Sequence, residues 1–284
     1  MALGGVEGLI QFVVSVLFTI SLQKWNISSN FTFRKLYRKM PIQTNQSVSV
    51  DCALFGFDGT ALRVLRIERP AYNNLERMKL PGSMIQQNET LPLAAERVLE
   101  GLTGMKIHYL KQLEIFSDPS RVSGDELEWI RQRYQIQTER VVTVGYYALV
   151  KLDRKLYDYT LSKGARWVSV DDIQRLAMDH KQILSVALGM LCREMQQSPI
   201  AFELLPRKFT ISELQRLFEA VLGIDLDNRN FRKKMFSSGF LAPTGEKQKG
   251  VAHKPAEYFT FDKNAYRRAV KAKLKMGFID NWRY

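Results

Sequence analysis

Cysteine is scarce in this chain, and its scarcity argues against a protein that is held together by disulfides. Only two cysteines occur in 284 residues, Cys52 and Cys192, and they form no Cys-x-x-Cys pair. A disulfide framework needs several cysteines and an oxidising compartment. Both cysteines lie among apolar residues, so we expect buried thiols in a reducing cytosol and a cytoplasmic protein.

A long hydrophobic run is also missing. The most apolar stretch, residues 9–22, has 14 residues, whereas a membrane-spanning helix needs about 20. It lacks the preceding basic segment and the following cleavage site of a secretory signal. Because Met40 stands a few residues before the first clear strand, we expect translation to begin there. Residues 1–39 are then upstream sequence read as protein, and residues 1–40 as a whole are expected to be a non-native or disordered extension with a short apolar segment. A membrane anchor is the alternative.

Acidic residues are too few to balance the basic ones. The chain has 42 Lys and Arg against 29 Asp and Glu, a formal net charge of +13. The excess is uneven, because residues 200–284 contain 17 basic and 9 acidic side chains, a net +8. This asymmetry suggests a polyanionic partner for the C-terminal part, most simply nucleic acid. The length suits two domains, each large enough for its own core.

Apolar periodicity predicts a mixed β-sheet that follows Met40. The first two strands, residues 47–57 and 61–68, flank Asp58-Gly59, a pair typical of hairpin turns. Further predicted strands are residues 110–116, 140–152 and 166–170. Predicted helices are residues 93–102, 125–133 and 181–195, the last of them following a cap at Asp171-Asp172.

Residues 80–104 resemble the Nudix box, a loop–helix–loop that holds divalent metal against a diphosphate through glutamates. The stretch opens with Leu-Pro-Gly, which ends at Gly82, and continues through a helix with Arg97 to Gly104. When it is aligned on Arg97 and Gly104, the positions of the three helical glutamates are occupied by Val98, Gly101 and Leu102. Magnesium needs hard oxygen ligands, which these residues do not offer. We therefore expect no catalytic residues, no metal ligands and no cofactor.

A second alignment of the same box stays open. Counting from Gly82 without a gap moves Glu100 onto one of the glutamate positions, although Gly101 still replaces its neighbour. Glu96 and Glu100, four residues apart, share a helix face. They are either solvated surface carboxylates or the remains of a metal site, so metal-dependent hydrolysis remains the alternative.

Arginines near the polar segment 118–138 are candidates for ligand binding. Asp118-Pro-Ser-Arg121 and the region around Arg140 resemble segments that border the ligand pocket of Nudix-domain regulators, and Arg69 has a similar place after the second strand. The resemblance implies an effector site of Arg69, Asp118, Arg121 and Arg140, in which a guanidinium forks onto a phosphate or a sugar hydroxyl. The alternative is that each arginine tethers a loop through an ion pair.

The C-terminal part has the layout of a helix-turn-helix followed by a wing. Thr210-Ile-Ser-Glu213 has capping-box spacing, and Gly223 ends the helix that it starts. A basic second helix follows at residues 228–239, and then two strands are joined by a loop rich in lysine and glycine. In this layout the second helix enters the major groove and the wing lies on phosphates.

The whole order resembles the Nudix-related transcriptional regulators, which join a Nudix-like sensor to a winged helix. The resemblance implies an α+β protein: a Nudix-like α/β/α sandwich with a mixed sheet at residues 45–197, and a winged helix-turn-helix domain at residues 200–270. A basic tail, residues 271–284, follows. The resemblance also implies a set of DNA-binding residues: Arg229, Asn230, Arg232, Lys233, Lys234, Lys247, Lys249, His253 and Lys254.

The function implied by this resemblance is a ligand-responsive transcriptional regulator. A homodimer would bind a double-stranded DNA operator, and its Nudix-like domain would sense a sugar or nucleotide-sugar without hydrolysing it. No membrane partner is expected. One alternative is a Nudix hydrolase of a nucleoside diphosphate derivative such as ADP-ribose. Another is a general nucleic-acid binder, whose affinity follows salt but not sequence.

Overall fold

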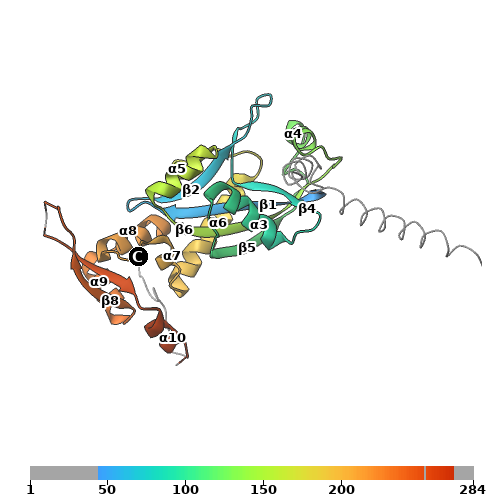
Figure 1. The fold of residues 1–284 in the computed structure, drawn as a ribbon. Coiled ribbons are helices and arrows are strands. Elements are labelled where there is room, and N and C mark those ends of the chain that lie inside the picture. The colour runs from blue at the N-terminus through green and yellow to red at the C-terminus, as the bar shows by residue number, and fades with distance from the viewer. Residues whose placement is uncertain (1–43, 253, 272–284) are drawn as a thin grey trace, which may run out of the picture. The chain divides into compact units, whose positions relative to one another are not determined.

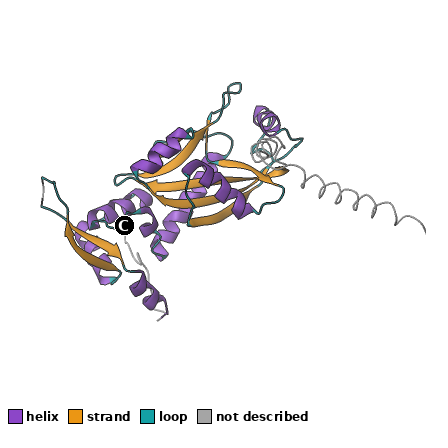
Figure 2. Ribbon diagram, in the orientation of Figure 1, coloured by secondary structure: helices purple, strands orange, loops and turns teal. Residues whose placement is uncertain are grey.

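The computed structural model describes residues 44–252 and 254–271. The expected extension 1–40, His253 and nearly all of the expected basic tail lie outside the described residues. Figure 1 shows the arrangement of the elements, and Figure 2 separates helices from strands. The N-terminal sheet contains β1 (Thr44–Phe57), β2 (Leu62–Glu68), β3 (Met78–Lys79), β4 (Gly82–Gln86), β5 (Tyr109–Phe116), β6 (Val142–Lys151) and β7 (Ala165–Ser169). The helices of the same region are α3 (Leu91–Thr103), α4 (Asp125–Tyr134), α5 (Arg154–Ser162) and α6 (His180–Gln197).

The sheet is mixed, as the sequence predicted. Its main path runs β3-β2-β1-β6-β5, while β4 also pairs with β1 and β7 with β2. The central pair, β1 and β6, is parallel, and the other pairings are antiparallel. The turn at Asp58 connects β1 to β2, and Gly59 there has a positive φ of 95°. The Asp58 carboxylate accepts hydrogen bonds from the backbone N–H groups of Thr60 and Ala61, both at 2.9 Å, which closes the turn.

Helices cover both faces of the sheet, which is the predicted α/β/α sandwich. Alternate residues of a strand point to opposite faces. Val50, Cys52 and Leu54 of β1 pack with buried residues of α3 and α5. Ala53 and Phe55 pack on the other face with α6. The box helix α3 and the long helix α6 therefore lie on opposite faces of the same strands.

The C-terminal region folds as the predicted winged helix and shares a core with the sandwich. Its elements are α7 (Ala201–Leu204), α8 (Ile211–Leu222), α9 (Asn228–Ser237), β8 (Leu241–Lys247), β9 (Glu257–Phe261) and α10 (Lys263–Lys271). One continuous cluster of buried apolar side chains includes Phe55 of β1, Leu191 of α6 and Phe218 of α8. The Cys192 thiol of α6 donates to the backbone carbonyl of Val221 in α8 at 3.0 Å. The domain limits at 197 and 200 stay a prediction.

One sequence-based assignment is wrong, and several elements were missed. Asp171 and Asp172 cap no helix: the Asp172 N–H donates to the Ser169 carbonyl in a turn, and α6 begins only at His180. The segment between them forms no regular helix or strand, and its Ala177 N–H donates to the Met78 carbonyl of β3 at 2.8 Å. The short strands β3 and β4 and the helices α5 and α10 were not predicted.

Within residues 44–252 and 254–271, none of the helices has the length and apolar character that crossing a membrane requires.

Candidate functional site

A partly open cavity lies where β1, β6 and the start of α6 meet, and its empty space of about 320 Å³ includes the open solvent at its mouth. The lining combines charged, hydroxyl and aromatic side chains with a few aliphatic ones. The lining residues are Ser49, Asp51, Lys79, Ser83, Met84, Arg121, Trp129, Ile130, Tyr134, Val141, Thr143, Met178 and His180.

Strand pairing places a carboxylate in the wall of this cavity. Asp51 lies on the α6 face of β1, between Gly82 of β4 and Gly145 of β6 in the two neighbouring strands. A Cβ atom on Gly82 would lie 1.7 Å from Asp51 Oδ1, so only glycine leaves room for this carboxylate. The box glycine is therefore required here by close packing against Asp51.

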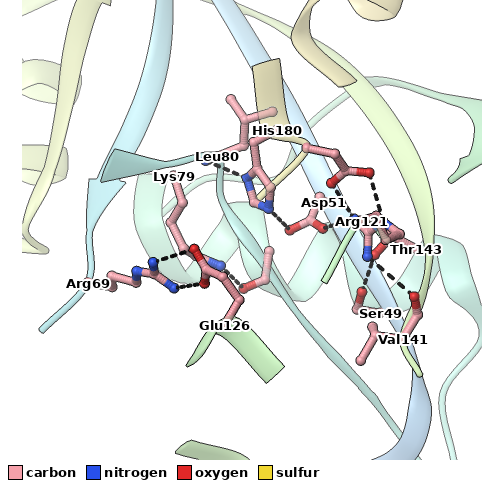
Figure 3. A network of polar contacts seen from close by, with 12 residues as sticks. Ser49, Asp51, Arg69, Lys79, Leu80, Arg121, Glu126, Val141, Thr143 and His180 are labelled. Atoms are coloured by element: carbon pink, nitrogen blue, oxygen red, sulfur yellow. Dashed lines mark hydrogen bonds and ion pairs between the residues drawn. The ribbon is translucent and has the colours of Figure 1, made fainter. Parts of the chain in front are cut away.

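His180, the first residue of α6, faces the same carboxylate. Its Nδ1 accepts a hydrogen bond from the Leu80 N–H at 2.9 Å, and its Nε2 lies 3.6 Å from Asp51 Oδ1 (Figure 3). Burial lowers the pKa of His180 well below 6.5, and the charge of Lys79 adds to this effect. The ring is thus neutral at pH 7, with its proton on Nε2, so its contact with Asp51 is dipolar rather than an ion pair.

Opposite effects act on the pKa of the Asp51 carboxyl group. Burial raises the pKa of its carboxyl group, while the charges of Lys79 and Arg121 and a hydrogen bond with Thr143 act against this rise. The nearest guanidinium nitrogen, Nη2 of Arg121, is 4.0 Å from Asp51 Oδ2. The Thr143 hydroxyl in turn lies 2.5 Å from that of Ser49, so the polar wall is internally hydrogen-bonded.

Two of the predicted effector-binding arginines lie at the cavity, and both are paired. Arg121 holds Asp179 through Nε and Nη2, at 2.7 and 2.6 Å. Arg69 holds Glu126 through Nη1 and Nη2, at 2.5 and 2.8 Å, and its guanidinium stacks 4.8 Å above the Trp129 ring centroid. Arg121 lines the cavity directly, whereas Arg69 reaches it through Trp129.

The other two predicted effector-binding residues are not in the cavity lining. Asp118 is exposed and caps its own turn through the N–H and hydroxyl of Ser120, at 2.7 and 2.6 Å. Arg140 is also exposed and donates through Nη2 to the Ser117 carbonyl at 2.5 Å. Both residues therefore organise the loop that leads to Arg121. Their assignment to an effector site stays a prediction.

Sequence reasoning missed the centre of the cavity, namely Asp51, Lys79 and His180. A signal existed for Asp51, because it is a charged residue inside a run of buried strand residues. Such a residue is rarely buried without a partner or a role. His180 and Lys79 are brought to Asp51 by the sheet and by α6, so their spacing along the chain carried no comparable signal.

The box helix lies on the opposite face of the sheet and does not fit a magnesium site. Of the residues at the glutamate positions, Val98 and Leu102 pack against its apolar cluster, and Gly101 is exposed. Arg97 forms a bidentate pair with Glu89, at 2.8 and 2.5 Å, which ties the helix to the preceding loop. Among the residues that the structure covers, no group of three His, Cys, Asp or Glu side chains could hold a metal ion.

The predicted DNA-binding residues lie mainly on α9 and on the wing. Asp227 caps α9 by accepting from the Asn230 N–H at 2.8 Å, and Phe231 and Met235 bury its inner face. The exposed predicted residues of this part are Arg229, Asn230, Arg232, Lys233, Lys247, Lys249 and Lys254, and Lys234 is half-buried. Lys247 is the last residue of β8, and Lys249 and Lys254 belong to the following loop.

Local sequence fixes both ends of α8, and a longer-range pairing holds the wing to it. The capping box is formed: the Glu213 N–H donates to the Thr210 hydroxyl at 3.2 Å, and the Thr210 N–H donates to Glu213 Oε2 at 2.7 Å. Gly223 ends α8 with a φ of 69°. The wing is joined to the segment before α8 by the reciprocal backbone hydrogen bonds of Phe209 and Phe259.

Comparison with known proteins gives one family match and several relatives. Residues 201–261 match the NrtR DNA-binding winged helix domain. The ADPR responsive transcriptional repressor NtrR of Acinetobacter baylyi is 29% identical over 240 residues, which cover 83% of this chain and 90% of that protein.

Two crystal structures of Shewanella oneidensis NrtR are similar to the fold. The one complexed with a 27mer DNA is 26% identical, with a TM-score of 0.62 over 78% of this chain and 95% of that chain. A second crystal structure of the same protein is 27% identical, with a TM-score of 0.61 over 76% of this chain and 94% of that chain. Taken with the sandwich, the altered box and the winged helix, these likenesses show that the chain is similar to the Nudix-related transcriptional regulators over most of its length.

Proposed function

We propose that this protein is a transcriptional regulator that binds operator DNA and changes its affinity when a small metabolite occupies the cavity. The observation that carries the proposal is the exposed basic face of α9, in a domain that matches a DNA-binding winged helix. A protein that works on chromosomal DNA would act in the cytoplasm, and this location stays a prediction.

The proposed DNA contacts divide into two groups. Arg229 and Asn230 are in the first turn of α9, where a recognition helix meets base edges, and their side chains suit guanine and adenine respectively. Lys247, Lys249 and Lys254 on the wing would hold phosphates, which position the protein without reading sequence. The Shewanella relative was crystallised with a 27mer DNA. A homodimer would place two such helices on the two halves of an operator.

The proposed effector is a sugar or a nucleotide-sugar, with ADP-ribose as the first candidate. The Acinetobacter relative is described as ADPR responsive, and the cavity combines cationic and aromatic side chains that suit a nucleotide. We propose binding without hydrolysis, because the box positions offer no carboxylates for magnesium under the alignment on Arg97. Hydrolysis of ADP-ribose is the competing function, since Glu96 and Glu100 remain on the helix.

The DNA part of the proposal is tested by selecting bound duplexes from a random pool and measuring affinities by fluorescence anisotropy. Loss of one good bidentate base contact costs about 1–3 kcal/mol, or roughly 5- to 150-fold in Kd. Arg229→Ala and Asn230→Ala should each weaken the selected site by that factor while leaving random DNA less affected. Arg154→Ala, an exposed arginine of α5, is the matched control. Failure to select any common sequence would leave only a general nucleic-acid binder.

The effector part is tested by repeating the anisotropy titration with ADP-ribose, free sugars and other nucleotides. A change in operator affinity with at least one of them is expected, and its absence for all of them would refute the sensing role. Incubation with ADP-ribose and magnesium, followed by measurement of AMP release, separates sensing from hydrolysis. If the protein hydrolyses ADP-ribose and Glu100→Gln abolishes this hydrolysis, the hydrolase function is favoured.

A further inference from the structure

Three cationic side chains stand at or next to the cavity, and two of them are already occupied. Arg121 holds Asp179 and Arg69 holds Glu126, each through two nitrogens of the guanidinium. A guanidinium fork that already binds a carboxylate offers a ligand little unless the ion pair breaks. Neither arginine is therefore poised to receive an anion.

Lys79 is different, because its charge has no such close partner. Its residue is only 6% exposed, and it forms part of the cavity wall. No ion pair within 4.0 Å includes its ammonium among the described residues, and its hydrogen bond goes to the Gly82 carbonyl at a long 3.4 Å. Asp51 interacts with it only at longer range, through its charge. An ammonium has three donors, so two remain available to a ligand.

The groups around Lys79 are suited to a phosphate. The hydroxyls of Ser49, Ser83 and Thr143 line the same cavity and can donate to anionic oxygens. Trp129 and Tyr134 line it as well and offer flat apolar surface to a base or a sugar. Figure 3 shows Lys79 in the same polar network as the Asp51–His180 contact, and its charge acts on both of these residues.

We infer that Lys79 is the phosphate anchor of the cavity, so that the effector is a phosphorylated sugar or a nucleotide rather than a free sugar. The inference rests on the proposed function, because it concerns the same cavity. A buried ammonium with unmade hydrogen bonds gains more from an anion than from a neutral hydroxyl. The predicted nucleotide-sugar is thereby favoured over an unphosphorylated sugar.

The test is isothermal titration of the full-length protein with ADP-ribose, ribose 5-phosphate, D-ribose and inorganic pyrophosphate. The phosphorylated probes should bind about 10- to 100-fold more tightly than D-ribose, the factor expected for a charge-assisted hydrogen bond. Lys79→Met keeps the length of the side chain and removes the charge, and it should lose that factor. Lys79→Arg should retain part of it. Lys155→Met, an exposed lysine of α5, is the matched control.

Operator affinity without effector, measured for each variant, shows that the variant is folded. If Lys79→Met binds every phosphorylated probe as tightly as the parent protein, or if D-ribose binds as tightly as ribose 5-phosphate, the inference is wrong. Failure of the parent protein to bind any of the phosphorylated probes overturns it as well. A divided outcome is also informative. If the parent protein binds pyrophosphate and Lys79→Met abolishes this binding, the phosphate anchor is supported. If at the same time no effector changes the affinity for DNA, the sensing role is refuted.

Discussion

Replacing Gly82 by alanine tests whether the Asp51 carboxylate is fixed in the cavity wall. The added Cβ atom would lie 1.7 Å from Asp51 Oδ1 and 2.7 Å from the Val50 carbonyl oxygen. Contacts this short do not persist, so either β4 or the carboxylate must move by more than 1 Å. Asp51 has little freedom to move, because it is fully buried and faces His180 and Arg121.

The cost follows from overpacking and from lost polar contacts. Forcing extra atoms into a packed site costs about 1–3 kcal/mol, and displacing a buried polar group from its partners costs about 1–3 kcal/mol more. We expect Gly82→Ala to lower the free energy of unfolding by about 3 kcal/mol. For a unit of roughly 200 residues this corresponds to a fall in Tm of about 6–12 °C.

Gly101→Ala is the matched control, because it changes a second box glycine to the same residue. Gly101 lies inside α3, and a Cβ atom there would meet nothing within 4 Å. Alanine is a better helix former than glycine by about 1 kcal/mol, so this variant should melt about 2–4 °C higher. Thermal denaturation followed by circular dichroism measures both variants.

The two variants should shift Tm in opposite directions, downward for Gly82→Ala and upward for Gly101→Ala. A Gly82→Ala protein that melts at or above the parental temperature would show that Asp51 is free to move aside. The conclusions that position 82 requires glycine and that Asp51 is fixed in the cavity wall would then be wrong.

Three further predictions concern other parts of the chain. Thr210→Ala removes the capping box of α8 and should lower the free energy of unfolding by about 1 kcal/mol, measured by urea denaturation. The pKa of His180 is lowered by burial, so the unfolded chain takes up this proton first as pH falls. The stability that His180 contributes is present above about pH 6.5 and is lost below it by up to about 1.4 kcal/mol per pH unit. His180→Gln should flatten this pH dependence in urea melts. Lys249→Ala should reduce the log–log salt slope of DNA binding by about 0.9 if it meets a phosphate, and Arg154→Ala should leave the slope unchanged.

Local signals predicted the elements that local chemistry stabilises. The turn at Asp58-Gly59 and the capping box at Thr210 were identified because each is formed by neighbouring residues. The cap predicted at Asp171-Asp172 is wrong: no helix begins before His180, and the intervening segment is held to β3 by the hydrogen bond from the Ala177 N–H to the Met78 carbonyl. The short strands β3 and β4 carry no apolar alternation, since they are ordered by pairing with β2 and β1.

The candidate site was predicted less completely than the fold. Arg121 was singled out through its resemblance to a ligand-pocket segment, and it does line the cavity. Asp51, Lys79 and His180 converge only through strand register and the position of α6. Pairs that are separated by 100 residues, such as Leu80 and His180, leave no spacing pattern to read.

The core shared by the sandwich and the winged helix implies that the two halves have no separate melting temperatures. Phe55, Leu191 and Phe218 belong to one buried cluster, so opening one half exposes apolar surface of the other. A metabolite that binds in the cavity should thus stabilise the wing against unfolding as well. A ligand that binds only the folded state adds its binding free energy to the whole cooperative unit. In a cell, supply of the effector would set how much intact regulator survives proteolysis as well as how tightly it holds DNA.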